Sequence, residues 1–226
     1  MMPEPLNGDL AARVVVDANR VPWTASPSRT VWRRRLHHVG AAESGQVTSI
    51  VRYEPGATFP IHDHPDGEEI LVLQGVFSDE HGDWPAGTYL LNPEGFRHAP
   101  FSREGCLLFV KLRQFPGRDR KHVAVDTRTI PWVTEAGRER KRLYAQEGYT
   151  DRMFLERWRA QPSPAEHRYP LGAEILIIDG AFEDEHGRHD AHTWLRLPPG
   201  SRHAPKSATG CELYVKEGGF PYLHPA

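Results

Sequence analysis

Residues 56–98 read GATFPIHDHPDGEEILVLQGVFSDEHGDWPAGTYLLNPEGFRH, and this stretch decides the fold. Its apolar runs, such as residues 69–73 (EILVL) and 88–91 (TYLL), have the length of β-strands. Glycine, proline, aspartate and asparagine separate these runs, as is typical of turns between short strands. No part of the stretch repeats apolar residues with the period of a helix. It therefore predicts a β-sandwich or β-barrel of short antiparallel strands.

The stretch occurs twice, because the chain is a tandem duplication. Residues 75–82 (GVFSDEHG) return as residues 180–187 (GAFEDEHG), and residues 93–100 (PEGFRHAP) return as residues 198–205 (PPGSRHAP). The offset between the copies stays constant through Lys111 and Lys216. Each copy has the size of a small domain. We therefore predict two all-β domains, residues 1–117 and residues 118–226.

Composition narrows the class of protein. The chain of 226 residues has 28 Lys and Arg against 30 Asp and Glu, a formal net charge of -2, which argues against a broad cationic face for nucleic acid or anionic lipid. Two cysteines cannot form a disulfide framework. Residues 1–5 (MMPEP) lack the features of a signal peptide, and no apolar run approaches the ~20 residues that span a bilayer. We expect a cytoplasmic protein.

Four side chains in the first copy have the spacing of a metal site. His62 and His64 are two residues apart, so in a strand both imidazoles face the same side. Glu68 has the parity needed to join them from the next strand, and the turn at residues 93–95 delivers His98. Three imidazoles and one carboxylate suit a divalent ion such as Fe, Mn, Zn, Ni or Co. We predict one such ion in this copy.

These spacings resemble a known family. The two stretches are Gly56-x5-His62-x-His64-x3-Glu68-x6-Gly75 and Gly87-x5-Pro93-x-Gly95-x2-His98. They are similar to the two cupin motifs, and only the Asn that often closes the second motif is replaced, by Ser102. Residues 67–73 (GEEILVL), 77–82 (FSDEHG) and 105–106 (GC) are similar to ChrR-type cupins, the family of the anti-sigma factor ChrR. The resemblance covers both copies.

The resemblance implies both a fold and a ligand set. Each copy would form a double-stranded β-helix, the cupin or jelly-roll barrel, and the two barrels of this bicupin would be related by pseudo-twofold symmetry. By motif match the metal ligands are His62, His64, Glu68 and His98, the same four that the spacing selects. The ion would be iron or zinc first, and manganese or nickel next. No catalytic residue follows from the match.

The second copy keeps only part of this set. His167 and His203 remain, but Tyr169 stands where the first copy has His64, and Ala173 replaces the glutamate. Glu174 aligns with Glu69 rather than with Glu68, so strand parity turns its side chain away from the pocket. Two imidazoles alone hold a metal poorly. We predict a degenerate site that is structural or binds a small ligand without metal.

The resemblance favours an enzyme, with two alternatives open. Cupins similar to the first copy include metal-dependent dioxygenases that act on diketones, hydroxy-ketones or phenolic compounds. The first alternative is a zinc-dependent sensor related to anti-sigma factors; the few residues before Val14 and the absence of a Cys-x2-Cys pair argue against sigma-factor binding. The second alternative is a module that binds a small molecule without turnover. Each option predicts a small-molecule ligand, with no nucleic acid and no membrane.

Four further expectations concern packing. Residues 14–16 and 123–125 would be exchanged between the copies, so that each covers a sheet edge of the other. The two barrels would pair within one chain, which leaves further association into a homodimer open. Phe59, Phe96 and Phe101 follow or precede the ligands closely and would form an apolar pocket mouth. The histidines of residues 186–192 would lie in a solvated turn.

Overall fold

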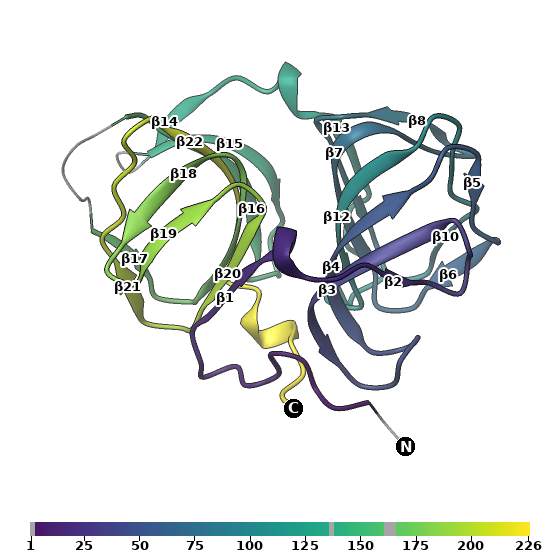
Figure 1. Ribbon diagram of the computed structural model, residues 1–226, viewed down its shortest axis with the longest axis horizontal. Coiled ribbons are helices and arrows are strands. Elements are labelled where there is room, and N and C mark those ends of the chain that lie inside the picture. The colour runs from purple at the N-terminus through teal and green to yellow at the C-terminus, as the bar shows by residue number, and fades with distance from the viewer. Residues whose placement is uncertain (1–2, 136–137, 161–165) are drawn as a thin grey trace. The chain divides into compact units, whose positions relative to one another are not determined.

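The strands that the sequence predicts curl into two barrels (Figure 1). A computed structural model describes residues 3–135, 138–160 and 166–226. In this part of the chain the only helices are three short 3-10 turns, η1 (Ala18–Arg20), η2 (Thr127–Thr129) and η3 (Phe220–Tyr222). The all-β prediction is thereby confirmed.

The first barrel is a ten-stranded sheet and a two-stranded sheet. The path of the large sheet is β13-β9-β7-β12-β4-β3-β2, with β5, β8 and β11 attached to it, while β6 pairs with β10. Its strands are β2 (Thr24–Ala25), β3 (Val31–Val39), β4 (Gln46–Tyr53), β5 (Ala57–Thr58), β6 (His62–His64), β7 (Glu68–Asp79), β8 (Gly82–Pro85), β9 (Thr88–Asn92), β10 (Phe96–His98), β11 (Phe101–Ser102), β12 (Cys106–Leu112) and β13 (Val123–Asp126).

The second barrel repeats this order. Its large sheet runs β1-β20-β18-β22-β16-β15-β14 with β19 attached to β18, and β17 pairs with β21. Its strands are β1 (Val14–Asp17), β14 (Val133–Glu135), β15 (Arg138–Ala145), β16 (Arg152–Trp158), β17 (His167–Tyr169), β18 (Ala173–Asp184), β19 (Gly187–Asp190), β20 (Thr193–Leu197), β21 (Ser201–His203) and β22 (Cys211–Glu217).

The edge strands are exchanged between the copies, as expected. Strand β1 pairs with β20, with Val14 opposite Arg196, and β13 pairs with β9, with Val123 opposite Leu91. Each arm satisfies backbone groups that an open sheet edge would expose. The two compact units are therefore residues 3–8, 21–129 and 224–226, and residues 9–20 and 130–223. They differ from the continuous halves 1–117 and 118–226 because each arm packs with the other copy.

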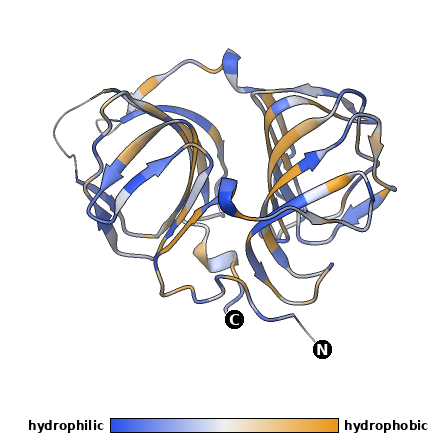
Figure 2. Ribbon diagram, in the orientation of Figure 1, coloured by the Kyte–Doolittle hydropathy of each residue, from blue (hydrophilic) through white to orange (hydrophobic). Residues whose placement is uncertain are grey.

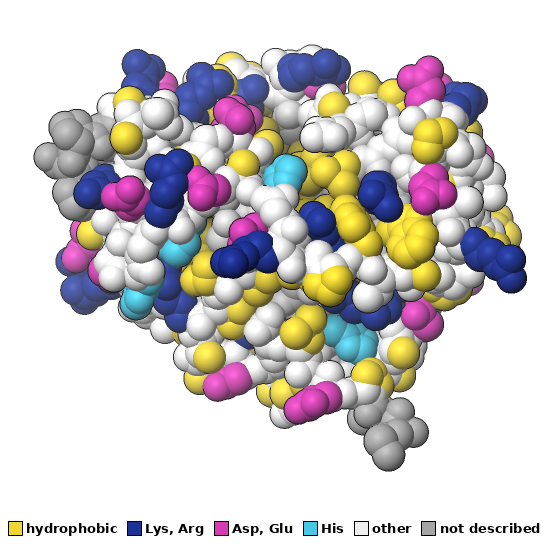
Figure 3. All heavy atoms as spheres, viewed as in Figure 1, with side chains coloured by type: hydrophobic (Ala, Val, Ile, Leu, Met, Phe, Trp, Pro, Cys, Tyr) yellow, Lys and Arg dark blue, Asp and Glu magenta, His cyan; other side chains and the backbone are white. Residues whose placement is uncertain are grey.

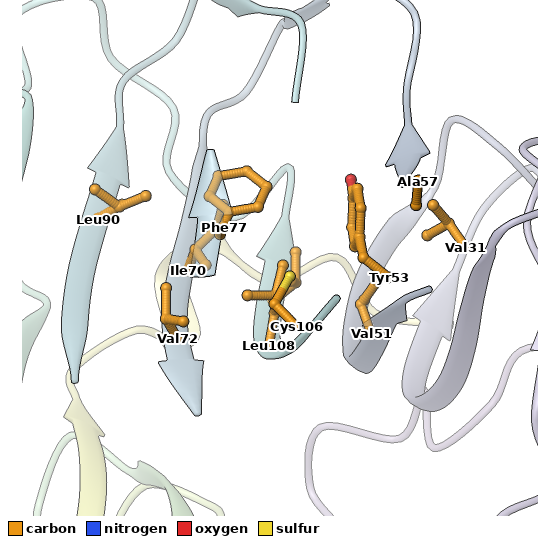
Figure 4. Packing of buried hydrophobic residues seen from close by; sticks show 11 residues of the cluster. Val31, Val51, Tyr53, Ala57, Ile70, Val72, Phe77, Leu90, Cys106 and Leu108 are labelled. Atoms are coloured by element: carbon orange, nitrogen blue, oxygen red, sulfur yellow. The ribbon is translucent and has the colours of Figure 1, made fainter. Parts of the chain in front are cut away.

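Each unit has its own apolar core. In the first unit, side chains from β3, β4, β5, β7, β9 and β12 gather between the strands (Figure 4). Ile70 and Val72 of β7 belong to this cluster, and their counterparts Ile175 and Ile177 of β18 belong to the core of the second unit. Alternate residues of a strand face one side, so Glu174, which precedes Ile175, faces away from that core. Hydrophobic segments follow the long strands of both units in Figure 2.

Strand β7 is bent at a glycine, Gly75. Gly75 has φ +72, and a Cβ there would lie 2.2 Å from the carbonyl oxygen of Gly105. The register between β7 and β12 shifts close by, between Leu107 and Leu108. Such a bulge bends a strand, and beyond this one β7 pairs with β8 through residues 76–79. The bend brings Asp79, the last residue of β7, towards His98.

Charges of both signs are mixed over the face that Figure 3 shows. Figure 3 shows Lys and Arg side chains interspersed with Asp and Glu across the visible face. This distribution agrees with a formal net charge of only -2. Among the described residues there is no helix of the length and apolar character that a membrane span requires.

Candidate metal centre

Two short strands carry the three histidines of the first unit. His62 and His64 lie at the ends of β6, and His98 ends β10, which pairs antiparallel with β6 so that His62 is opposite His98. Glu68 is the first residue of β7. The alternation of β6 and the antiparallel register together bring the imidazoles to one side. The structure thus brings together all four residues that the sequence predicts.

The donor atoms of these residues lie within reach of one ion. One ligand nitrogen from each histidine lies within 4.8 Å of the other two, a grouping that could hold a metal ion. Nε2 of His64 is 3.0 Å from Nε2 of His98. An oxygen of Glu68 lies 3.4 Å from the first of these nitrogens and 3.5 Å from the second. His64, Glu68 and His98 are buried, whereas His62 is partly exposed.

Hydrogen bonds leave lone pairs of this group facing inward. Nδ1 of His62 donates to the carbonyl of Pro60 at 2.9 Å, and Nδ1 of His98 donates to Asp79 at 3.1 Å. In the neutral tautomer, Nε2 of each ring is then an acceptor. Imidazole nitrogens and a carboxylate that converge at these distances suit a divalent transition metal. The donor set therefore fits the metal that the fold family implies.

Asp79 supports His98, and the sequence analysis missed this role. Its carboxylate also accepts hydrogen bonds from the backbone N–H of His81 and Gly82 and from Nε1 of Trp84. Burial opposes the charged carboxylate, but these bonds and the one from His98 lower the pKa of Asp79 overall. One signal was available, because the same aspartate recurs as Asp184 in the second copy.

Asn92 is a second residue that the sequence analysis missed. It lies opposite Glu68 in the β7–β9 pair and donates from Nδ2 to Oε2 of that glutamate at 2.9 Å. The second copy has Ala173 opposite Leu197 at this pair, so the glutamate and its partner are both replaced. This joint replacement, and a buried amide that ends an apolar strand, are the signals that could have identified it.

Two of the rings have shifted pKa values. Burial is the largest influence on His64 and lowers its pKa, and the neighbouring histidines and Arg113 add to this effect. Burial acts in the same direction on His98, but the hydrogen bond to Asp79 and the charge of Glu68 outweigh it, so the pKa of His98 is raised. The Asp79 carboxylate thus stabilises positive charge on the ring that it orients.

Replacing Asp79 with asparagine should weaken metal binding by about 10–100-fold, the usual cost of losing a partner that orients a ligand. The amide lacks the negative charge and cannot accept all of the present hydrogen bonds. Competition with a chelator measures the dissociation constant. Asp83→Asn is the matched control, since this exposed carboxylate binds Ser78 and Arg103 instead. Equal affinities for Asp79→Asn and the unmodified protein would contradict the role of Asp79.

A cavity of about 340 Å³ opens from the candidate ligands into the first unit. His62, His64 and Glu68 line it, and most of its remaining wall is apolar, including Val51, Phe77 and Leu108. Phe59 lines it too and packs on the ring of His62 at 5.1 Å between centroids. Phe96 and Phe101 are not part of the wall, so the predicted aromatic mouth is correct for one phenylalanine of the three.

In the second unit, larger and charged side chains occupy the corresponding space. The strand registers align Glu156 with Val51, Trp158 with Tyr53, and Glu217 with Leu112. Glu156 is fully buried, accepts from Nε1 of Trp158 at 2.7 Å and pairs with Arg140 at 2.8 Å. Arg140 also pairs with Glu217 at 2.6 Å. An ion-pair network thus replaces the cavity wall of the first unit.

The surviving histidines of the second unit lie in surroundings that disfavour a cation. Burial and then the charge of Arg138 lower the pKa of His167 to about 3. Nδ1 of His167, Nε2 of His203 and the Tyr169 hydroxyl are buried and have no hydrogen-bond partner among the described residues. The absence of metal from this copy stays a prediction, now supported by a physical reason.

The expectation that the histidines of residues 186–192 lie in a solvated turn is correct for His186, which is exposed in a turn, and wrong for His189. His189 is buried rather than solvated, and its Nε2 is 3.0 Å from Asp184. It lies on β19, where strand alternation turns it inward. Asp184 also contacts Nδ1 of His203 at 3.4 Å and pairs with Arg13 of the exchanged arm at 2.6 Å. The aspartate of the degenerate site therefore ties the arm to the second unit.

Solved structures with the same fold include enzymes. A "putative dioxygenase" from Nostoc punctiforme is 16% identical, with TM-score 0.74, over 93% of this chain and 82% of that one. Protein Ylba from E. coli is 12% identical, with TM-score 0.71, over 93% of each chain. A mutant of Bacillus subtilis oxalate decarboxylase is 12% identical, with TM-score 0.65, over 94% of this chain and 78% of that one. At these identities the likeness establishes the fold alone.

The sequence comparisons identify the family. A comparison with curated proteins finds no match. The family of the ChrR Cupin-like domain matches twice, at residues 11–116 and 120–221. These two segments cover most of the chain and coincide with its two copies, which confirms the resemblance found in the motifs. The chain therefore belongs to the family of ChrR cupin-like domains and carries the domain in tandem.

Proposed function

We propose that this protein is a metal-dependent enzyme, a dioxygenase-like bicupin that acts on a small oxygen-rich substrate such as a diketone, hydroxy-ketone or phenolic compound. One divalent ion would be held by His62, His64, Glu68 and His98. The observation that carries the proposal is that these donors converge at the wall of a largely apolar cavity of about 340 Å³. The description of the Nostoc punctiforme structure supports the same class of reaction.

A bound divalent ion would supply a Lewis acid for substrate oxygens and, if it is iron, a redox centre for O2. The chain's own residues prepare the site. Asn92 fixes the orientation of the Glu68 carboxylate, and Asp79 holds the proton of His98 on Nδ1, away from the cluster. The apolar wall excludes water from the substrate and so strengthens polar contacts inside the cavity.

Elemental analysis and oxygen uptake test this function together. The full chain is reconstituted with iron and exposed to a panel of β-diketones, hydroxy-ketones and phenolic compounds. We expect about one ion per chain and oxygen consumption with at least one compound class. Protein that binds one iron per chain but consumes no oxygen with any of the panel would contradict the enzyme.

A sensor or ligand-binding module is the second candidate, and membership of the ChrR cupin-like family favours it. Such a protein would use the same four donors to close a tetrahedral zinc site. It would bind zinc in a stoichiometric amount and show a ligand-induced rise in melting temperature without product. Oxygen-dependent turnover would exclude this candidate.

A further inference from the structure

The cavity wall of the first unit includes an arginine, Arg113, that has no role in the proposed metal site. Arg33 and Arg113 both contribute to its wall. Arg33 is paired with Glu43 at 3.0 Å, whereas no acidic group of the described residues forms an ion pair with Arg113. His62, His64 and Glu68 line the same cavity, so Arg113 shares it with the candidate ligands.

The backbone of Arg113 is held in an unfavourable conformation. Its φ of 60 lies in the left-handed region, where a residue with a Cβ is disfavoured. The counterpart in the second copy is Gly218, with φ 72 and an equivalent backbone bond: the N–H of Arg113 donates to Gly67, and that of Gly218 to Gly172. The turn itself therefore requires no side chain. A strained arginine where glycine suffices indicates that its side chain has a function.

A hydroxyl in the same cavity also lacks a partner. Ser49 is 1% exposed and lines the cavity, and its Oγ has no hydrogen-bond partner among the described residues. The counterpart in the second copy is the apolar Phe154, which the register places opposite Val215 as Ser49 is placed opposite Val110. A buried hydroxyl without a partner is costly, which points to a polar ligand atom in this cavity.

We infer that the cavity selects a substrate with a carboxylate separate from its metal-binding oxygens, and that Arg113 binds this carboxylate while Ser49 bonds a second polar atom. The inference rests on the proposed function, since the four metal donors hold the other end of the substrate. A guanidinium pairs with a carboxylate through two parallel hydrogen bonds. The other charged side chains of the wall outside the metal site are Arg33, Glu43 and Asp63. Arg33 pairs with Glu43 and Asp63 pairs with Arg97, so Arg113 is left to match one negative charge, whereas the more highly charged phosphate monoester would need further donors.

Two probe compounds isolate the carboxylate. Heptane-2,4-dione and 4,6-dioxoheptanoate share a β-diketone and a seven-carbon chain and differ by the terminal carboxylate. Calorimetry measures the affinity of each for the metal-loaded full chain. We expect the acid to bind about tenfold more tightly or better, because a hydrogen bond to a charged group contributes at least that factor.

Arg113→Gly should abolish this preference while leaving the affinity for the dione and the metal content unchanged. The variant keeps the turn that Gly218 forms in the second copy, so its melting temperature should be equal or higher. Arg113→Asn is a second variant that tolerates a left-handed backbone. Arg103→Ala is the matched control, since it removes an exposed arginine that pairs with Asp83, and its preference should not change.

The outcomes separate the inference from the proposed function. If the acid and the dione bind equally to metal-loaded protein, or if both Arg113 variants keep the preference, the inference is overturned and the metal site stands. If the unmodified protein takes up no metal, the proposed function fails first, and the inference with it. A tenfold preference that disappears in the Arg113 variants and persists in Arg103→Ala supports both.

Discussion

Replacing His62 with alanine should leave the purified protein almost free of bound metal, whereas the same replacement of His167 should not change its metal content. The two histidines are counterparts, so the chemical change is identical. His62 lies with two imidazoles and a carboxylate, and its loss should weaken metal binding by more than the ~100-fold that supporting partners contribute. His167 faces Tyr169 and Ala173 in place of two ligands.

Elemental analysis of each variant after reconstitution and desalting provides the measurement. His62→Ala should also lose any oxygen consumption that the unmodified protein shows. Circular dichroism establishes that both variants are folded. A full equivalent of metal in His62→Ala would remove this residue from the ligand set, and a loss of metal in His167→Ala would place the ion in the second unit instead.

Replacing Glu156 with alanine should lower the free energy of unfolding by about 3–5 kcal/mol, because the loss of one partner leaves the other charge of a buried ion pair uncompensated. Glu156 is fully buried, and it is bonded to Arg140 and Trp158. Arg140 would keep only Glu217, which is itself 29% exposed. Urea unfolding, followed by tryptophan fluorescence, measures the change.

The control for this variant is Glu139→Ala. Glu139 is also a glutamate of the second unit and pairs with Arg159, but that arginine side chain is 80% exposed. Surface pairs of this kind contribute little, so the control should unfold nearly as the unmodified protein does. If the two variants unfold at the same urea concentration, the buried network does not stabilise the second unit.

The sequence predicted those features that depend on local pattern. Strand-length apolar runs and turn residues indicated an all-β chain, and the repeated motifs indicated two copies. His62 and His64 required only the alternation of a single strand. Glu68 and His98 were found from parity and motif spacing, and the structure brings both to the first two.

What the sequence did not reveal depends on register between distant strands. Asp79 read as a turn residue, because its approach to His98 depends on the bend at Gly75. The ion-pair network inside the second unit was also not predicted, because Arg140 and Glu217 lie on strands that are far apart in the sequence. The sequence predicts a solvated turn at His189, whereas the strand β19 that buries it has only 4 residues and gives too weak a pattern to recognise.

The exchanged arms have a consequence for biosynthesis. Strand β1 emerges from the ribosome early, but its partner β20 is about 180 residues further along the chain, a very non-local pairing. At the ~5–20 residues per second of translation, the arm waits for many seconds with unpaired backbone groups. The first barrel likewise waits for β13, which lies beyond the first copy. Nascent chains of this protein therefore pass through a stage in which the arm β1 and the β9 edge of the first sheet are both unpaired, when chaperones or self-association compete for them.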